Sequence, residues 1–413
     1  YMEGYYLYRL DGMLLYNNRE TTFIDYIATE KTLPFIKEYL KDKPITLNSP
    51  EILYAPAESG KKFRLLPDKT EEDQAWNKKA ASFQKKPLKN QVLFVSPRAD
   101  GHLEGNAKAL YPFIKGKKVI CAKRLPHDPE TALEMTEVIL TSKVIVTDDY
   151  VKYLRYFPLR PEQRVIQLWH ACGAFKLFGL SELGLTDLAQ NTRNHRTYTR
   201  AIVSGSAMAP FYSEAFGMNI NNIRQTGIPR TDVFFDKDYR KETVAALYER
   251  YPQWKDKKIV LFAPTFRGSG NKTAFYPMER FPIDLVMNAL PPDTVLLVKQ
   301  HPFVHSDLSM YRECDFSDRL FDLTGKENIN DLLFITDLLV TDYSSSIFEA
   351  ALIDIPMIFY AFDLEEYLRE RDLYFDFAEF VPGEIVEDLQ TLISRMQEVL
   401  ISPAKTSVDD SFR

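Results

Sequence analysis

Two of the six histidines in this sequence, His170 and His301, follow short apolar runs, His170 directly and His301 after Lys299 and Gln300. Residues 165–169 precede His170, and residues 296–298 precede Lys299 and His301. Imidazole titrates near neutral pH, so a histidine at the end of a buried strand can act as a general base. We predict this role for His170. The alternative is a structural histidine that caps the sheet through a hydrogen bond.

Cationic side chains accompany these histidines. Lys299 and His301 are two positions apart, so on an extended chain they face the same side. Arg267 follows another apolar run, at residues 260–263, and its planar guanidinium suits a phosphate. These residues favour an anionic ligand. A solvated sheet edge and an ordinary surface arginine are the alternatives.

A fourth apolar run ends in a cluster of small polar residues. After residues 339–341 come Asp342, Tyr343, Ser344, Ser345 and Ser346. Serine is a preferred N-cap, and the free N–H groups of a helix start bind anions. Capping needs one serine, so three favour a pyrophosphate site. Glu349 lies four residues after Ser345, on the same helix face, and could accept ribose hydroxyls; an ordinary helix carboxylate is the alternative.

Composition excludes several classes of protein. The 413 residues carry a formal net charge of −6, which argues against a uniformly basic nucleic-acid-binding protein. The three cysteines are far apart and give neither a disulfide framework nor a zinc-binding spacing. Asp148 and Asp149 follow an apolar run without a third ligand, so we predict no required metal or other cofactor. No apolar run approaches the roughly 20 residues that span a bilayer, and the first residues lack a signal-peptide pattern.

The elements that must position these residues form two series. Short apolar runs alternate with helical patterns from residue 91 to 204 and again from 259 to 400, which is typical of buried parallel sheets. Such sheets bind ligands at the carboxyl ends of their strands. Residues 5–15 have instead the pattern of a hairpin around Asp11 and Gly12.

We therefore predict an α/β protein of three parts. Residues 1–85 form a small N-terminal appendage and linker, β-rich or mixed. Residues 86–228 form a first Rossmann-like domain, and residues 229–402 form a second.

Jointly, these motifs resemble those of the CDP-glycerol glycerophosphotransferase family, which includes teichoic acid polymerases and primases and related capsule polymerases. The resemblance covers about residues 90–400 and rests on segments 168–170, 265–267, 299–302, 341–345, 356–360 and 363–367. One loop differs. After the first histidine the family usually has Gly-Thr-Pro, whereas residues 171–176 here read Ala-Cys-Gly-Ala-Phe-Lys.

The resemblance implies a GT-B-like fold of two Rossmann-like domains, with the active site in the cleft between them. It implies catalytic roles for His170, His301 and Arg267. The residues expected to bind the donor are Thr265, Lys299, Asp342, Ser344, Ser345, Ser346 and Glu349. The loop that contains Gly173 and Lys176 is expected to line the acceptor or the reacting phosphate.

The reaction implied is transfer of glycerol phosphate or ribitol phosphate from CDP-glycerol or CDP-ribitol to a teichoic acid-like or capsule polymer, either lipid-linked or an oligosaccharide. The acceptor hydroxyl attacks the polyol-side phosphorus, His170 removes its proton, and CMP leaves. Two alternatives stay open. One is a nucleotide-sugar glycosyltransferase of the same architecture, and the other is a non-catalytic nucleotide-binding scaffold of a capsule assembly complex.

The resemblance also implies a cytoplasmic protein, peripherally associated with the inner face of the cell membrane. Residues 175–188 are rich in Leu and Phe and are followed by basic residues, as in an interfacial amphipathic segment. A buried segment with a solvated face is the alternative. The choice between glycerol and ribitol and the oligomeric state, a homo-oligomer included, stay open.

Overall fold

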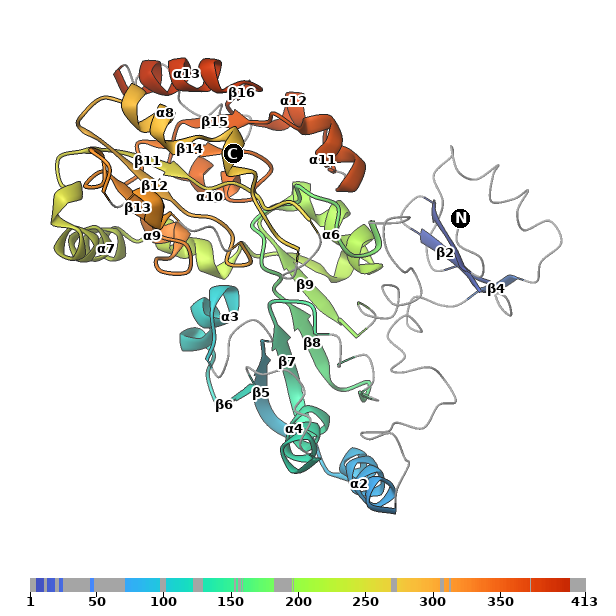
Figure 1. Ribbon diagram of the computed structural model, residues 1–413. Helices are drawn as coiled ribbons and strands as arrows, with labels where there is room; N and C mark the ends of the chain where they lie inside the picture. The colour runs from blue at the N-terminus through green and yellow to red at the C-terminus, as the bar shows by residue number, and fades with distance from the viewer. Residues whose placement is uncertain are drawn as a thin grey trace. The chain divides into compact units, whose positions relative to one another are not determined.

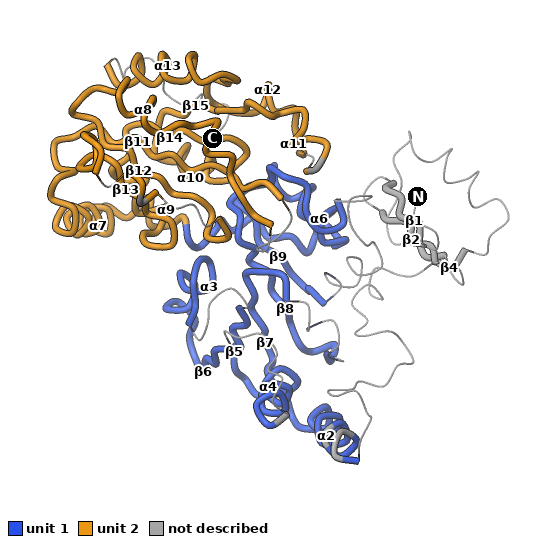
Figure 2. Tube along the Cα trace, in the orientation of Figure 1, with its two compact units in different colours: residues 1–230 blue, residues 231–413 orange. Residues whose placement is uncertain are grey.

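The computed structural model divides into two compact units, residues 1–230 and residues 231–413 (Figure 2). It describes the strands within residues 5–47 and then residues 71–96, 102–121, 129–151, 154, 157, 159–181, 195, 197–268, 273–304, 308–311, 313–371 and 373–401. Three sheets organise these residues, one of four strands and two of six.

The four-stranded sheet follows chain order and consists of β1 (Tyr5–Leu10), β2 (Met13–Asn18), β3 (Thr22–Ile24) and β4 (Ile45–Leu47). Strands β1 and β2 pair antiparallel with Leu10 opposite Met13, which confirms the predicted hairpin. The rest of the predicted appendage, up to residue 70, lies outside the described residues.

Helix α2 (Glu71–Ser82) and the 3₁₀ helix η2 (Phe83–Lys85) occupy the segment in which the sequence predicts a polar linker. Asn77, Ala80 and Phe83 are buried at intervals of three residues. This spacing gives the segment one buried face, and the segment contacts α4 (Pro129–Thr141).

The second sheet lies in unit 1 and has six parallel strands in the order β10-β9-β8-β7-β5-β6. They are β5 (Lys89–Val95), β6 (Lys117–Cys121), β7 (Ser142–Thr147), β8 (Arg164–Gln167), β9 (Arg200–Val203) and β10 (Ile223–Gln225). Its helices are α3 (Gly105–Leu110), η3 (Tyr111–Phe113), α4 (Pro129–Thr141), η5 (Gly179–Ser181), η6 (Ser206–Met208), α6 (Ala209–Phe216) and η7 (Ile220–Asn222). Because the strand order reverses at β5 and β7, their carboxyl ends flank the topological switch point (Figure 1).

The third sheet lies in unit 2 and is also parallel, in the order β13-β12-β11-β14-β15-β16. Its strands are β11 (Lys258–Phe262), β12 (Thr294–Val298), β13 (Leu320–Asp322), β14 (Leu338–Thr341), β15 (Met357–Tyr360) and β16 (Glu384–Val386). Its helices are η8 (Pro229–Phe234), α7 (Lys237–Arg250), η9 (Pro252–Trp254), η10 (Met278–Arg280), α8 (Ile283–Ala289), η11 (Ser309–Tyr311), α9 (Ile329–Leu333), α10 (Ile347–Ala351), α11 (Leu364–Glu370), α12 (Phe377–Phe380) and α13 (Leu389–Ile401). The switch point here lies between β11 and β14.

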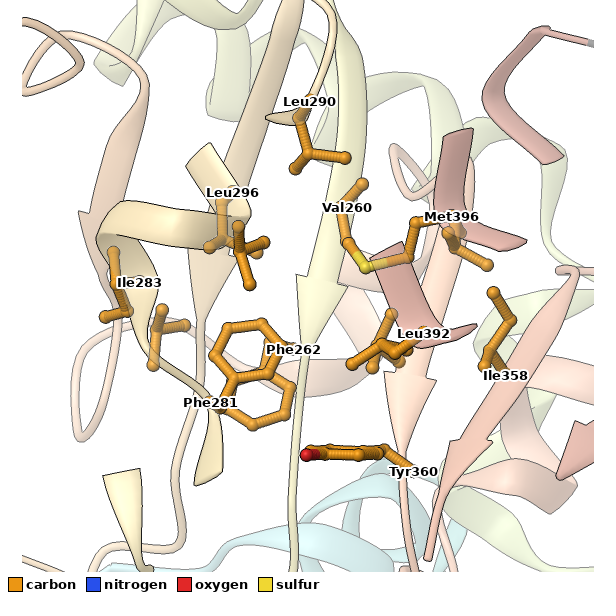
Figure 3. Close-up of a cluster of buried hydrophobic side chains, with 14 of the residues drawn as sticks. Val260, Phe262, Phe281, Ile283, Leu290, Leu296, Ile358, Tyr360, Leu392 and Met396 are labelled. Carbon is orange, nitrogen blue, oxygen red and sulfur yellow. The ribbon is translucent and has the colours of Figure 1, made fainter. Parts of the chain in front are cut away.

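Apolar side chains that alternate along each strand form the core of unit 2. Val260 and Phe262 of β11 project to the same face of the sheet, where they meet side chains from α8 and α13 (Figure 3). The ring of Phe262 stacks on Phe281 with centroids 3.8 Å apart. Every residue of β12 is buried, as expected for a strand covered on both faces.

The prediction of an α/β protein with two parallel sheets is confirmed, and most expected strands fall within two residues of their predicted bounds. Two boundaries were wrong. The strand before His170 ends at Gln167, because Trp169 has φ = 56° and cannot continue an extended chain. The helix after the serines begins at Ile347 rather than Ser345.

Candidate active site

His170 lies three residues beyond β8, at the carboxyl end of the strand. Its side chain is 34% exposed, and its Nδ1 lies 3.3 Å from Oδ1 of Asp149, the second residue after β7. Strands β7 and β8 are neighbours in the sheet, so their ends bring these two residues together. The indole of Trp169 stacks on the imidazole, with ring centroids 4.3 Å apart. The result is a partly exposed imidazole beside a carboxylate.

The backbone that carries His170 is held in place by buried amides. The Trp169 N–H donates to Oε1 of Gln167 at 2.8 Å, and Nδ2 of Asn106 donates to the carbonyl of Trp169 at 2.8 Å. Gln167 also donates from Nε2 to the carbonyl of Asp149 at 3.0 Å. Gln167 and Asn106 are both almost fully buried. These bonds stabilise the left-handed conformation of Trp169, which costs roughly 1–2 kcal/mol in an L-residue.

The two aspartates after β7 have different environments. Asp148 is 3% exposed and accepts hydrogen bonds from the Ser96 hydroxyl at 2.9 Å and the Ala107 N–H at 3.3 Å. It therefore ties the end of β7 to β5 and to α3. Asp149 faces His170 instead. From the sequence, Asp148 and Asp149 were weighed only as metal ligands; the signal for the contact of Asp149 with His170 is that both residues follow consecutive strands of one sheet.

The loop after His170 packs into unit 1. Gly173 is buried, Lys176 is partly exposed, and the Tyr212 hydroxyl lies 3.3 Å from the carbonyl of Gly173, to which it donates. Phe175 and Leu180 are 2% and 6% exposed. The interfacial interpretation of this segment is therefore wrong for its described part, because these apolar side chains face the protein interior; residues 182–190 lie outside the described residues.

His195 is buried in an aromatic cage under this loop. Its ring contacts the rings of Tyr150, Trp169, Tyr198 and Phe216. Burial lowers the pKa of His195 to about 3, because the interior penalises the charged imidazolium. His195 is therefore neutral at physiological pH.

In unit 2, Arg267 occupies the switch point between β11 and β14. Its Nε and Nη2 donate to the two carboxylate oxygens of Asp363 at 2.7 and 2.8 Å. Its Nη1 donates to Oδ2 of Asp342 at 2.9 Å and to the carbonyl of Thr265 at 2.6 Å. Four of the five N–H donors of the guanidinium are thus used within the protein.

This geometry changes the interpretation of Arg267. The sequence predicts a guanidinium open to a phosphate, whereas the side chain is 8% exposed and closed on two carboxylates. Burial alone would lower its pKa, but Asp363 and Asp342 outweigh burial and raise it, so the charge is fixed. Arg267 holds the loop after β11 against the loops after β14 and β15, and its direct contact with a phosphate stays a prediction.

Asp342 and Thr265 belong to the same buried network. Oδ1 of Asp342 accepts the N–H of Thr265 at 2.7 Å and the N–H of Tyr343 at 2.6 Å. The Tyr343 hydroxyl donates to Asp363 at 3.0 Å. Thr265, Arg267 and Asp342 are among the predicted site residues. Asp363 is not, although it lies in this network; it is 96 residues from Arg267 along the chain.

Lys299 and His301 follow β12, but their side chains contact different neighbours. Lys299 donates from Nζ to the carbonyl of Leu323, just beyond β13, at 3.1 Å; burial lowers the pKa of Lys299, opposed by Glu327 and Asp322. His301 lies 4.8 Å from the Phe266 ring, in the loop after β11. These contacts lie on opposite sides of β12 in the sheet, so the two cations do not form the pair that their spacing predicts.

The neighbour of Nδ1 distinguishes the two predicted catalytic histidines. Nδ1 of His301 accepts the N–H of Phe303 at 3.2 Å, which leaves Nε2 as the protonated nitrogen of the neutral ring. Nδ1 of His170 faces a carboxylate, which favours a proton on Nδ1 and a lone pair on Nε2. His301 is therefore suited to donate a hydrogen bond, and His170 is suited to accept a proton.

The serine cluster precedes a short helix. The hydroxyls of Ser344 and Ser346 lie 2.9 Å apart, and Ser344 Oγ accepts the N–H of Ser346 at 3.3 Å. Ser346 is the N-cap of α10, without a capping bond from its side chain, and Ser345 is partly exposed. Glu349 is 1% exposed, and its contact with a ribose stays a prediction.

The described residues contain neither a candidate metal cluster nor a membrane-spanning helix. Within residues 71–401, apart from their undescribed gaps, no group of three or more His, Cys, Asp or Glu side chains could hold a metal ion. None of the described helices is both long enough and apolar enough to cross a bilayer.

This chain is similar to a known protein family and to several known teichoic acid polymerases. Residues 78–407 match the family described as CDP-Glycerol:Poly(glycerophosphate) glycerophosphotransferase. The chain is 42% identical over 267 residues to the teichoic acid poly(ribitol-phosphate) polymerase of Bacillus spizizenii, which covers 64% of this chain and 43% of that protein. It is 43% identical over 254 residues to the teichoic acid ribitol-phosphate polymerase TarK of Staphylococcus aureus, which covers 61% of this chain and 49% of that protein. The chain thus spans about half the length of these curated relatives.

A solved structure has the same fold. The wall teichoic acid polymerase TagF matches 78% of this chain and 84% of its own with a TM-score of 0.63 at 20% sequence identity. The fold is therefore GT-B-like, with two parallel sheets. Since the family match covers residues 78–407, the chain belongs to the CDP-glycerol:poly(glycerophosphate) glycerophosphotransferase family.

Proposed function

We propose that this protein transfers a polyol phosphate from a CDP-activated donor to a hydroxyl group of a teichoic acid-like polymer and releases CMP. The observation that carries the proposal is the family match over residues 78–407, which includes every predicted site residue. The partly exposed imidazole of His170 and the ammonium group of Lys299, just beyond β12, support a phosphoryl transfer of this kind.

Ribitol phosphate is the transferred group that we favour. Relatives named as ribitol-phosphate polymerases or primases are 41–44% identical to this chain. Those named as glycerol-phosphate primases, a transferase or a polymerase are 29–30% identical. The difference supports CDP-ribitol over CDP-glycerol as donor.

In the proposed reaction, the acceptor hydroxyl oxygen bonds to the polyol-side phosphorus while the bond from that phosphorus to the CMP oxygen breaks. Nε2 of His170 takes the hydroxyl proton. His301, through its Nε2–H, and Lys299 stabilise negative charge on the phosphates. Arg267 acts on the site through Asp342 and Asp363, which its guanidinium holds in place.

The proposal also assigns the donor and acceptor contacts. Ser344, Ser345 and Ser346 offer hydroxyl and N–H donors beyond β14, and the loop with Gly173 and Lys176 is assigned to the acceptor. We infer that the protein acts at the cytoplasmic face of the membrane, where a lipid-linked acceptor would be presented. Co-sedimentation with liposomes at low and high salt tests this location, since electrostatic attachment weakens as salt rises.

Acceptor-dependent nucleotide release tests the proposed function. The purified chain is incubated with a lipid-linked ribitol-phosphate acceptor and with CDP-ribitol, CDP-glycerol or a UDP-sugar. We expect CMP release that needs the acceptor and is fastest with CDP-ribitol. Release of UDP would instead support a glycosyltransferase, and tight CDP binding without turnover would support a scaffold; either result overturns the proposal.

A further inference from the structure

Asp149 is a carboxylate for which the reaction above has no role, although it lies against the proposed base. Its Oδ1 is 3.3 Å from Nδ1 of His170, and the Tyr150 N–H donates to the same oxygen at 2.7 Å. The contact with the imidazole is long and is not aligned as a straight hydrogen bond. Catalytic hydrogen bonds are often long or poorly aligned in the absence of substrate and shorten when substrate binds. A distance of 3.3 Å is therefore compatible with a catalytic pair.

The protein holds both partners at their backbones. The carbonyl of Asp149 accepts hydrogen bonds from the Thr147 hydroxyl at 3.1 Å and from Nε2 of Gln167 at 3.0 Å. The other end of the Gln167 amide accepts the N–H of Trp169. One buried side chain therefore fixes the spacing between the ends of β7 and β8, and with it the spacing between the carboxylate and the imidazole.

Backbone strain points to the same place. Trp169 is one of three non-glycine residues with positive φ among the described residues, and it directly precedes His170. Strain of this kind persists only where the surroundings enforce it, and it is concentrated at functional sites. Here it turns the chain out of β8 and delivers the imidazole to Asp149, with the indole of Trp169 stacked on its face.

We propose that Asp149 is the positioning residue of His170: its carboxylate holds a proton on Nδ1 and the imidazole plane in place, so that Nε2 carries the lone pair. Asp149 stays ionised throughout. When Nε2 takes the proton of the acceptor hydroxyl, the carboxylate stabilises the imidazolium that forms. The role in catalysis rests on the proposed function, whereas the tautomer of His170 does not.

The variant Asp149→Asn tests the proposal, with Asp148→Asn as its matched control. The amide introduced at position 149 retains an oxygen for the Tyr150 N–H but loses the charge. We expect kcat to fall about 10²-fold with little change in KM, and the acidic limb of the kcat/KM profile to move to lower pH. Asp148→Asn should lower thermal stability and leave the limb in place. A D149N profile that superimposes on the wild type overturns the proposal.

A measurement without turnover separates this proposal from the proposed function. Long-range ¹H–¹⁵N spectra of the imidazoles, with the His170 signals identified from their loss in His170→Ala, report which nitrogen is protonated. We expect Nδ1–H for His170 in the wild type and a loss of that preference in D149N, with His301 unchanged as an internal reference. If His170 is Nε2–H in the wild type, the role of Asp149 is refuted even where CMP release is normal. If the tautomer is as expected and no CMP is released, only the proposed function fails.

Discussion

The His170–Asp149 pair at the strand ends of unit 1 is partly open to solvent, whereas the network of Arg267, Asp342 and Asp363 in unit 2 is enclosed. His170 and Asp149 are 34% and 21% exposed at their side chains. Arg267, Asp342 and Asp363 are 8%, 1% and 14% exposed and share charge-assisted hydrogen bonds. An exposed imidazole can exchange a proton with a substrate, but a buried guanidinium between two carboxylates cannot. We therefore expect proton exchange at the His170–Asp149 pair of unit 1, whereas the charges of the Arg267 network in unit 2 stay fixed.

The two predicted catalytic histidines differ in the same way. Nδ1 of His170 faces a carboxylate, while Nδ1 of His301 accepts a backbone N–H. The same side chain is thus prepared as a proton acceptor in one unit and as a hydrogen-bond donor in the other. The residue type is the same in both cases, so the difference comes from the group that Nδ1 of each ring contacts.

His170→Ala tests the predicted role of His170 as the general base and should have the largest effect. We expect CMP release to fall by about 10²–10⁴-fold, because a general base contributes that much, while thermal stability stays near that of the wild type. His102→Ala is the matched control, since His102 is an exposed histidine of the same unit. Near-normal turnover by H170A would refute the base assignment.

Arg267→Ala tests how much the buried ion pairs of Arg267 with Asp342 and Asp363 stabilise unit 2. The variant leaves Asp342 and Asp363 without their cation, so we expect unit 2 to lose about 3–5 kcal/mol of unfolding free energy in urea titrations. Arg395→Ala is the control, because Arg395 also pairs with two carboxylates, Glu384 and Glu398, but on the surface. Equal effects of the two variants would show that burial does not distinguish these networks.

His195→Phe tests whether burial keeps His195 neutral, and it should have the smallest effect of the three variants. The effect is on the pH dependence of stability. The folded pKa of His195 is about 3 and the ordinary value is 6.5, so above pH 6.5 the ring is neutral in both states. Below pH 6.5 the unfolded chain binds a proton that the folded protein does not, and stability falls by about 1.4 kcal/mol per pH unit. Between pH 7.5 and 5.0 the wild type should therefore lose about 2 kcal/mol more than H195F. Thermal scans at both pH values measure this, and identical losses would contradict the burial of a neutral His195.

Local pattern was enough to predict much of the fold. Short apolar runs between helical patterns predict buried parallel strands whatever their order, and the predicted runs at residues 296–298 and 339–341 lie within β12 and β14. Elements without a strong apolar pattern were missed. Helix α7 has a single buried residue, Leu247, and β16 has three residues, of which one is buried.

The sequence by itself determined which polar residues stand at the strand ends, because an apolar run that stops at a polar residue is a local feature of the chain. Only the tertiary structure decided what those residues contact. Strand β7 lies beside β8, so Asp149 meets His170; the chain returns after β15 beside the loop after β11, so Asp363 closes on Arg267 across 96 residues. Strand order is set by packing of the whole sheet, and no local spacing encodes it.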